Sequence, residues 1–296
     1  MMNGVICVNK PKGFTSFDVI AKMRGIAHQR KIGHTGTLDP LATGVLILLF
    51  GNATKAAEMI PDKTKSYIAD FKLGLATDTQ DITGKVISEC EHYSVSEQEV
   101  KEVLESFLGE IEQIPPMYSA VSVGGKRLYE LARQGIEVER KPRKAVISEI
   151  HLMSFDGTCG KVSLICSEGT YVRTIINDMG TKLGIGATMT ELVRTRASGF
   201  TLKDCITLIE AQELADKNML ETKLIPTDKL FSCYPAIYLS EKQASMFKNG
   251  IRLDSKRISH KGEGLYRVYG SEFLAIGKIA NEELIIKKSF YGKSEG

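Results

Sequence analysis

The chain has 296 residues, of which 43% are hydrophobic and 25% are charged, and its formal net charge is +3 at pH 7. These values predict a soluble globular protein of one large domain or two domains. The longest apolar run, 45–50, is far shorter than a membrane span, which excludes a helical membrane protein.

The cysteines and the start of the chain indicate a reducing compartment. None of the six cysteines is spaced as Cys-x-x-Cys, and the five histidines are scattered. We therefore expect reduced thiols, with no zinc site and no disulfide framework. Residues 1–5 lack the basic and apolar blocks of a signal peptide, so we expect a cytoplasmic location.

The first predicted elements lead to a glycine-rich loop. Residues 5–8 predict a short strand, and 15–27 begin with a Thr-x-x-Asp capping pattern that predicts a helix. The segment 33–44 contains three glycines and Asp39, and it leads into the apolar run 45–50. That run has the length of a buried strand.

The local pattern leaves two interpretations of Asp39 open. Asp before Pro is common in turns, where the carboxylate bonds its own backbone, and spacing alone favours that role. An acid held on a stiff loop at the mouth of an apolar sheet can also be a nucleophile or a general base. A phosphate-binding loop is excluded, because no Gly-x-x-x-x-Gly-Lys-Ser/Thr occurs here.

The run Gly-x-Leu-Asp-Pro-x-Ala-x-Gly over 36–44 closely resembles the catalytic motif of the TruB family of tRNA pseudouridine synthases. The resemblance implies that Asp39 is catalytic and that the chain forms pseudouridine at the uridine numbered 55, in the T arm of tRNA. It also implies that the target nucleotide flips out of the folded T loop to reach the site. His34, near the same acid, is by default a polar loop residue, and in this family context it could stack in the space that the base leaves.

Residues 65–73 predict a strand in which Tyr67 shares one face with every second residue. By pattern alone Tyr67 is a packing residue. The family resemblance implies that its ring lies against the target base, and the segment 74–81 also resembles the family. A capping box at 96–99 then predicts a helix that runs through Leu108 and ends at Gly109.

The segments 113–120 and 124–133 resemble a second signature of the TruB family. This resemblance implies a thumb-like insertion at about 112–144, a hairpin followed by a basic helix, that grips the T loop. Lys126 to Lys144 holds seven basic and three acidic residues. Ser122 departs from the family pattern, in which many relatives have a basic residue, so one phosphate contact is expected to be missing.

The segment 169–173, Gly-Thr-Tyr-Val-Arg, predicts a turn from a strand into a helix. Arg173 falls in the first helical turn, where a cation gains nothing from the helix dipole, so we expect a carboxylate to face it. The family resemblance implies that this carboxylate is Asp39, with Tyr171 packed under the pair or bonded to it. Residues 187–195 predict a strand, in which the family places Leu192 against the base.

The last third of the chain predicts a linker at 225–235 and a helix at 240–248. The short strands 264–268, 273–279 and 284–288 follow and resemble a small PUA-like RNA-binding barrel. The overall expectation is an α+β fold with a mixed, mainly antiparallel central sheet flanked by helices. We expect a catalytic domain at 1–230 and a C-terminal PUA-like domain at 231–296.

Local basic patches on a nearly neutral protein suit a polyanion bound on one face. The resemblance implies that this partner is tRNA and that a monomer binds it without a membrane. The residues expected at its phosphates are Lys10, Lys126, Arg127 and Arg133. Pseudouridine formation is an isomerisation within one nucleotide, so we expect no cofactor and no metal.

Two alternatives remain open at this stage. A non-catalytic tRNA-binding or RNA-chaperone protein could use the same basic surfaces, although it would not need Asp39, Arg173 and Tyr67 together. A synthase that acts on a different RNA would need all three residues.

Overall fold

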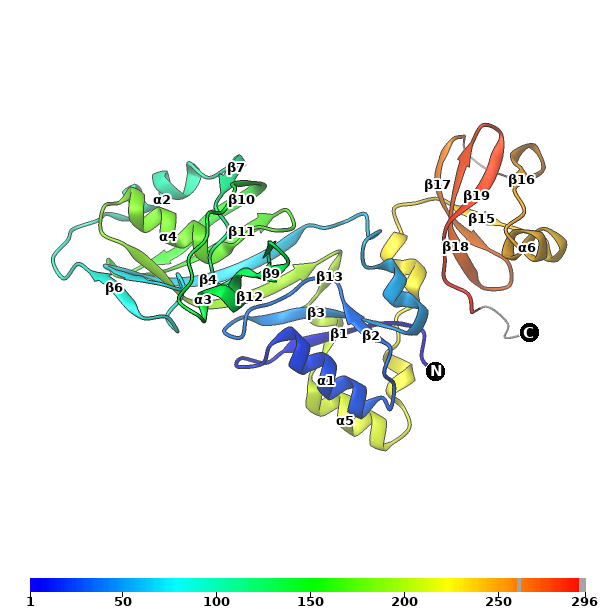
Figure 1. Cartoon of the computed structure of the whole chain (residues 1–296), viewed down its shortest axis with the longest axis horizontal. Helices are drawn as coiled ribbons and strands as arrows, with labels where there is room; N and C mark the ends of the chain where they lie inside the picture. The colour runs from blue at the N-terminus through cyan, green and yellow to red at the C-terminus, as the bar shows by residue number, and fades with distance from the viewer. Residues whose placement is uncertain (260–261, 293–296) are drawn as a thin grey trace.

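The structure, a computed structural model, describes residues 1–259 and 262–292. Figure 1 shows an elongated molecule in which one large sheet extends through the left and centre, and a smaller β-rich unit lies at the right. The last four residues of the expected C-terminal domain, 293–296, lie outside the described residues.

The large sheet has ten strands, ordered β14-β1-β3-β12-β4-β11-β10-β7, with β2 paired to β3 and β13 paired to β12. Their bounds are β1 (Gly4–Lys10), β2 (Ile32–His34), β3 (Thr43–Phe50), β4 (Lys65–Leu73), β7 (Gly109–Gln113), β10 (Arg143–Phe155), β11 (Cys159–Cys166), β12 (Ala187–Ala197), β13 (Phe200–Thr201) and β14 (Cys205–Ile206). Only the β1–β14 and β3–β12 pairs in this sheet are parallel. The expected mixed, mainly antiparallel α+β fold is therefore confirmed.

Six α-helices and five 3-10 helices occur in the described part of the chain. They are α1 (Ser16–Ile26), α2 (Glu97–Glu105), α3 (Leu128–Ala132), α4 (Val172–Lys182), α5 (Leu208–Asp216), α6 (Glu241–Lys248), η1 (Gly51–Ala56), η2 (Leu202–Asp204), η3 (Leu220–Lys223), η4 (Thr227–Phe231) and η5 (Ser255–Arg257). The predicted capping box of α1 is present, since the Thr15 hydroxyl accepts from the Asp18 amide and Asp18 bonds back. The predicted end of α2 is wrong: the helix stops at Glu105, and Gly109 begins β7 instead of ending the helix.

Two small hairpins and a second sheet complete the chain. The hairpins are β5 (Leu75–Thr77) with β6 (Val86–Glu89), and β8 (Ser122–Val123) with β9 (Lys126–Arg127). The C-terminal sheet, ordered β15-β17-β18-β19-β16, consists of β15 (Ala236–Tyr238), β16 (Leu253–Asp254), β17 (Gly264–Tyr269), β18 (Phe273–Ala280) and β19 (Glu283–Ser289).

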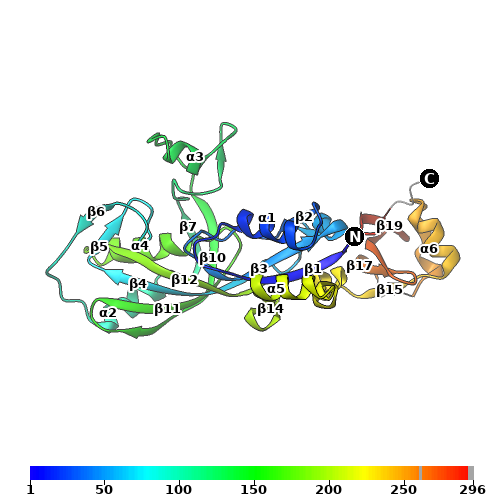
Figure 2. The same cartoon turned by 90° about the horizontal axis from the view of Figure 1, so that it is seen from below.

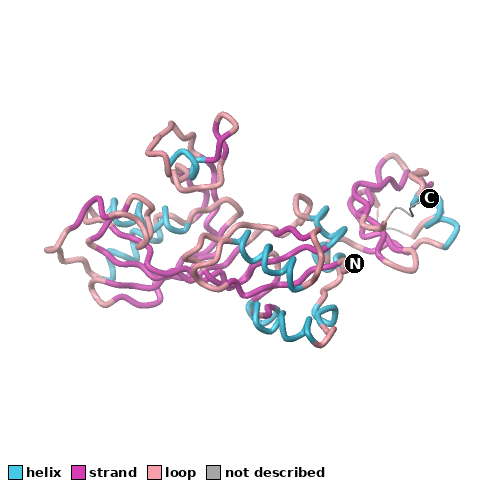
Figure 3. The backbone as a smooth tube through the Cα atoms, turned by 60° about the horizontal axis from the view of Figure 1, so that its bottom comes forward, coloured by secondary structure: helices cyan, strands magenta, loops and turns pink. Residues whose placement is uncertain are grey.

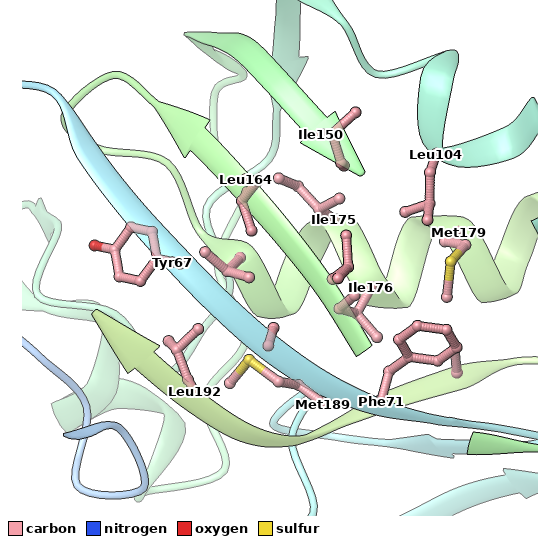
Figure 4. Close-up of a cluster of buried hydrophobic side chains, with 14 of the residues drawn as sticks. Tyr67, Phe71, Leu104, Ile150, Leu164, Ile175, Ile176, Met179, Met189 and Leu192 are labelled. Atoms are coloured by element: carbon pink, nitrogen blue, oxygen red, sulfur yellow. The ribbon is translucent and has the colours of Figure 1, made fainter. Parts of the chain in front are cut away.

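The largest hydrophobic core lies between α4 and the strands β4, β11 and β12 (Figure 4). The predicted alternation of β4 is confirmed, because every second side chain from Tyr67 to Leu73 is buried. Figure 4 shows Phe71 beside the α4 residues Ile176 and Met179. This core fixes α4, and with it the helix start that carries Arg173.

The segment 225–235 is packed rather than a free linker, so that prediction is wrong. Ile225 exchanges backbone hydrogen bonds with Val5, 2.8 Å each way. Phe231 is fully buried in a cluster that also holds Ile47 of the large sheet and Ile276 of the C-terminal sheet. Burial of this apolar surface fixes the C-terminal unit against the face of β1 and β3 that carries Val5 and Ile47.

The insertion predicted as a thumb, with β8, β9 and α3, stands away from the sheet on the side that also carries α1 (Figure 2). Figure 3 shows this lobe as mostly loop around one short helix and one small hairpin. The predicted hairpin followed by a helix is therefore present. In the described residues, no helix combines the length and the apolar character that a membrane crossing needs.

Two helical glycines give a matched test of the packing of α4. A Cβ at Gly180 would lie 2.0 Å from the backbone nitrogen of Ala187, whereas a Cβ at Gly25 would meet nothing within 4 Å. We expect Gly180→Ala to lower the free energy of unfolding by about 1–3 kcal/mol or more, because the backbones must separate. Gly25→Ala should raise it by up to about 1 kcal/mol. Urea denaturation measures both, and equal midpoints for the two variants would contradict this close contact.

Candidate active site

The loop between β2 and β3 that carries Asp39 is hydrogen-bonded to two side chains from the N-terminal segment, Ser16 and Lys10. The Ser16 hydroxyl accepts from the Leu38 amide at 2.8 Å and donates to the Leu38 carbonyl at 3.2 Å. The Lys10 ammonium donates to the carbonyls of Pro11 at 3.0 Å, Pro40 at 3.4 Å and Phe14. These bonds fix the backbone on both sides of Asp39.

Arg194 holds the same loop from the sheet. Its side chain is 1% exposed, and it donates to the carbonyls of Gly36 at 3.1 Å, Thr37 at 3.4 Å and Val45 at 2.7 Å. Gly44 pairs with Arg194 across β3 and β12, with φ of +103°, and a Cβ there would lie 2.2 Å from the Arg194 carbonyl oxygen. A glycine is therefore required where the loop enters β3.

Asp39 faces Arg173: the helix-dipole argument predicts a carboxylate at this place, and the family resemblance implies that it is Asp39. The Nη1 atom of Arg173 lies 3.1 Å from Oδ2 of Asp39, and the side chains are 5% and 35% exposed. Asp39 thus lies in a polar, partly open position while the arginine is buried. The fold brings together two residues that are 134 positions apart.

A second carboxylate, Asp81, shares the same guanidinium. Its Oδ2 lies 3.6 Å from Nη1 of Arg173, and its side chain is 6% exposed. Its Oδ1 accepts from the Thr79 hydroxyl and the Thr83 amide, both at 2.9 Å. Arg173 therefore lies between two acids, one fixed by hydroxyl and amide donors and one free to face a ligand.

Burial raises the pKa of the Asp39 carboxyl, and the Arg173 cation opposes that effect. Asp81 raises the pKa further, and Lys10 lowers it. Burial also lowers the pKa of Lys10 to about 8. The site holds a carboxylate that is costlier to ionise than an exposed Asp, next to cations that favour its ionised form.

Arg173 also connects the Asp39 loop to the insertion. Its Nη2 donates to the Tyr118 carbonyl at 2.6 Å, and its guanidinium lies 5.9 Å from the centre of the Tyr171 ring. The Tyr171 backbone is fixed by Gln113, which accepts from its amide at 3.0 Å and donates to its carbonyl at 3.2 Å. These hydrogen bonds hold the start of the insertion, at Gln113 and Tyr118, next to the Asp39–Arg173 ion pair.

Tyr67 and Leu192 lie on neighbouring strands, at the end of the core shown at the left of Figure 4. Each is 7% exposed. Burial raises the pKa of the Tyr67 phenol, which keeps it neutral. His34 is half-buried and accepts from the Gly36 amide at 3.2 Å through Nδ1, and burial together with Arg194 lowers its pKa, so the ring is neutral at pH 7.

One predicted phosphate contact is wrong. Lys10 is fully buried and its ammonium is occupied by backbone carbonyls, so its side chain does not reach a surface where a phosphate could lie. Its place in the fold is that of a support for the Asp39 loop. The thumb residues Lys126, Arg127 and Arg133 are exposed, which a phosphate contact requires.

Asp81 and Arg194 also belong to this site, although neither is among the residues predicted from the sequence. Arg194 did carry a signal, since it shares the buried face of its strand with Leu192, two positions earlier, where an unpaired cation is costly. Asp81 lies in the segment 74–81 that resembles the family, without a local feature that assigns it a role. Across the described ranges, no cluster of three or more His, Cys, Asp or Glu side chains is arranged to hold a metal ion.

Comparison with known proteins gives family matches over most of the chain. The N-terminal domain of the TruB family pseudouridylate synthases matches residues 24–172, and the C-terminal domain of tRNA pseudouridylate synthase B matches residues 173–232. The tRNA pseudouridine synthase B of Clostridium tetani is 43% identical over 97% of this chain and 99% of its own length. That of Bacillus cereus is 44% identical over 86% of this chain and 85% of its own length.

Solved structures share the fold. A Cbf5-Nop10-Gar1 complex contains a chain that is 25% identical, with a TM-score of 0.73, and the match covers 97% of this chain and 85% of that one. An H/ACA RNP bound to a substrate RNA containing 2′-deoxyuridine contains a chain at 23% identity with a TM-score of 0.74, covering 98% of this chain and 86% of that one. These matches extend through the C-terminal sheet.

The shared guanidinium predicts unequal effects on stability. Asp39→Asn should not lower the free energy of unfolding at pH 7, because Arg173 keeps Asp81 as a counter-charge and the partly buried charge of Asp39 is removed. Arg173→Met should lower it by about 3–5 kcal/mol, because two carboxylates lose their partner. Urea denaturation at pH 7 measures both.

The pH dependence of unfolding tests whether the charge of Asp39 lowers the stability of the folded protein. Its pKa is raised on folding, so the stability cost of its charge is present at neutral pH and disappears as the pH falls below the ordinary Asp value of 3.8. The stability difference between Asp39→Asn and the wild type should shrink on acidification. A difference that grows instead would contradict the assigned direction.

Proposed function

The chain belongs to the TruB family of pseudouridylate synthases, and from that premise we propose that it is a tRNA pseudouridine synthase whose target is the uridine numbered 55 in the T arm. The observation that carries the proposal is the 3.1 Å contact between Asp39, one-third exposed, and the buried Arg173. A turn residue that only bonded its own backbone would not need this partner. The curated relatives named tRNA pseudouridine synthase B support the same activity.

The reaction breaks the N1–C1′ bond of uridine, rotates the uracil and joins C5 to C1′. It can begin with attack of a carboxylate on the sugar, with attack on the base, or with removal of a proton from the sugar. Each of these starts requires an ionised carboxylate pointed at the nucleotide, which is the role we assign to Asp39. The hydrogen on C5 is released as a proton and N1 takes up a proton, so the product is an isomer of uridine and no redox step is needed.

Arg173 is assigned the task of orienting that carboxylate. Its Nη2 donates to the Tyr118 carbonyl, and its Nη1 lies between Asp81 and Oδ2 of Asp39, which leaves the other oxygen of Asp39 for the nucleotide. Arginine presents donors in a rigid planar fork that matches a carboxylate. This arrangement holds the reacting atom in place before substrate binds.

The flipped base is assigned to Tyr67 and Leu192, whose apolar surfaces lie on adjacent strands below the loop. Stacking and apolar contact would retain the uracil while it is detached from the sugar. Neutral His34 can stack in the space that the uridine leaves, and Tyr171 supports the guanidinium of Arg173 from one side.

The insertion is proposed to grip the T loop through its exposed basic side chains. We also propose a division into a catalytic domain, 1–230, and a PUA-like RNA-binding domain that begins at 231. The separate sheet β15–β19 supports this division, although its core merges with the body at Phe231. A cytoplasmic monomer acting on tRNA completes the proposal.

Release of tritium from tRNA labelled at C5 of uridine tests the activity directly. The wild type should release about one tritium per tRNA transcript, and Asp39→Asn should release none while it keeps its fold and its affinity for tRNA. Mapping the product to uridine 55 distinguishes the proposal from a synthase for another RNA. Near-normal turnover by Asp39→Asn would remove Asp39 from the mechanism.

The thumb should dominate the salt dependence of binding. Replacing Lys126, Arg127 and Arg133 with Gln should weaken tRNA binding and reduce the slope of log K against log salt by about 2, because fewer counterions are released. The rate at saturating enzyme should change less.

A matched triple variant at Lys203, Lys217 and Lys223, exposed positions near α5, controls for net charge. Equal loss of slope in both triple variants would show that overall charge, and not the thumb, sets the salt dependence.

A further inference from the structure

Two exposed phenylalanines lie beside the Asp39 loop and have no part in the mechanism above. Phe14 is 38% exposed and Phe17 is 63% exposed. Among the residues that the structure describes, Tyr238 is the one other phenylalanine or tyrosine with such high exposure, and it belongs to the C-terminal sheet. Two of these three aromatic residues therefore lie in one short segment at the start of α1.

This segment is attached directly to the backbone around Asp39. Phe17 follows Ser16, whose hydroxyl bonds both backbone groups of Leu38. The Phe14 carbonyl accepts from the Lys10 ammonium, which also reaches the Pro40 carbonyl. The backbone at Phe14 and Phe17 is therefore tied by hydrogen bonds to Leu38 and Pro40, the two residues that flank Asp39.

The helix start is also rigid, which suits a binding surface. Thr15 and Asp18 form the capping box, with bonds of 3.0 Å from the Asp18 amide to the Thr15 hydroxyl and 2.8 Å from the Thr15 amide to the Asp18 carboxylate. A capped first turn holds Phe17 without the entropy cost of ordering a loop when a ligand binds.

A cation lies next to the exposed ring. The Arg24 guanidinium is 5.9 Å from the centre of the Phe17 ring, and its Nη2 donates to the Ile32 carbonyl at 3.3 Å. An exposed aromatic face beside a cation matches the two parts of a nucleotide, because the base can stack and the phosphate can approach the charge. A purely apolar partner would not need the cation.

We propose that Phe17, with Phe14 beside it, stacks against a nucleobase next to the target uridine, and that Arg24 faces the phosphate of that nucleotide. The inference rests on the proposed function, because it takes the substrate to be RNA whose uridine flips toward Asp39. A flipped uridine leaves its neighbours without a stacking partner, and a fixed aromatic ring beside the site replaces it. The start of α1 is hydrogen-bonded to the Asp39 loop through Ser16 and Leu38. The thumb rises from the side of the sheet that also carries α1 (Figure 2).

The test measures tRNA affinity in the Asp39→Asn background, so that chemistry does not intervene. Phe17→Ala should raise the Kd for tRNA by about 5-fold or more, and Phe17→Tyr, which keeps the ring, should stay within about 2-fold of the parent. Ile209→Ala, at a position that is 73% exposed on α5, is the matched apolar control and should leave the Kd unchanged. Circular dichroism verifies that each variant is folded.

Abasic RNA identifies the stacked base. Two tRNAs are compared, one with an abasic nucleotide on the 5′ side of the target uridine and one with it on the 3′ side. The one that lacks the stacked base should bind less tightly to the Asp39→Asn protein, which keeps Phe17. With one of these two RNAs the penalty of Phe17→Ala should disappear, as a double-mutant cycle requires for a direct contact. A Phe17→Ala penalty that persists with both abasic RNAs, or no penalty at all, would overturn the inference.

Failure of the proposed function is distinguishable from this failure. If the wild type releases no tritium from labelled tRNA, the proposed function is wrong. If the wild type is active and Phe17→Ala binds tRNA as the parent does, only the stacking inference is wrong.

Discussion

The contact of Arg173 with two carboxylates is the constraint on which the rest of the site depends. A guanidinium that is 5% exposed needs a compensating charge, and Asp81 at 3.6 Å and Asp39 at 3.1 Å provide two. Because Asp81 is held by hydroxyl and amide donors, it fixes the arginine, and the arginine fixes Asp39. Asp39 can then face substrate while Arg173 stays paired with Asp81.

Two further buried cations support the loop, Arg194 through the backbone before Asp39 and Lys10 through the backbone after it. Lys10 and Arg194 are 0% and 1% exposed, and the bonds described above go to main-chain carbonyls around Asp39. Burying such groups is costly, and several hydrogen bonds to carbonyls offset that cost. The result is a loop whose shape is set by the sheet below it, which suits a reaction that needs a positioned carboxylate.

The sequence predicted most of what local pattern determines. The alternation at Tyr67 and the capping box at Thr15 are both present in the structure, and a helix-dipole argument together with the family motif placed Arg173 opposite Asp39. It missed what depends on long-range packing. The burial of Lys10 follows from carbonyls that converge only in the folded chain, and Phe231 is buried because two sheets meet there. No local pattern encodes either contact.

The most direct test of the account is the single-turnover rate of Arg173→Lys at saturating enzyme, measured together with its affinity for tRNA. Lysine keeps the charge but loses the planar group that contacts Asp39 through Nη1 while Nη2 donates to the Tyr118 carbonyl. We expect the rate to fall by about 100-fold while the Kd for tRNA changes little. A rate close to that of the wild type would contradict the claim that the Asp39–Arg173 geometry is the basis of catalysis.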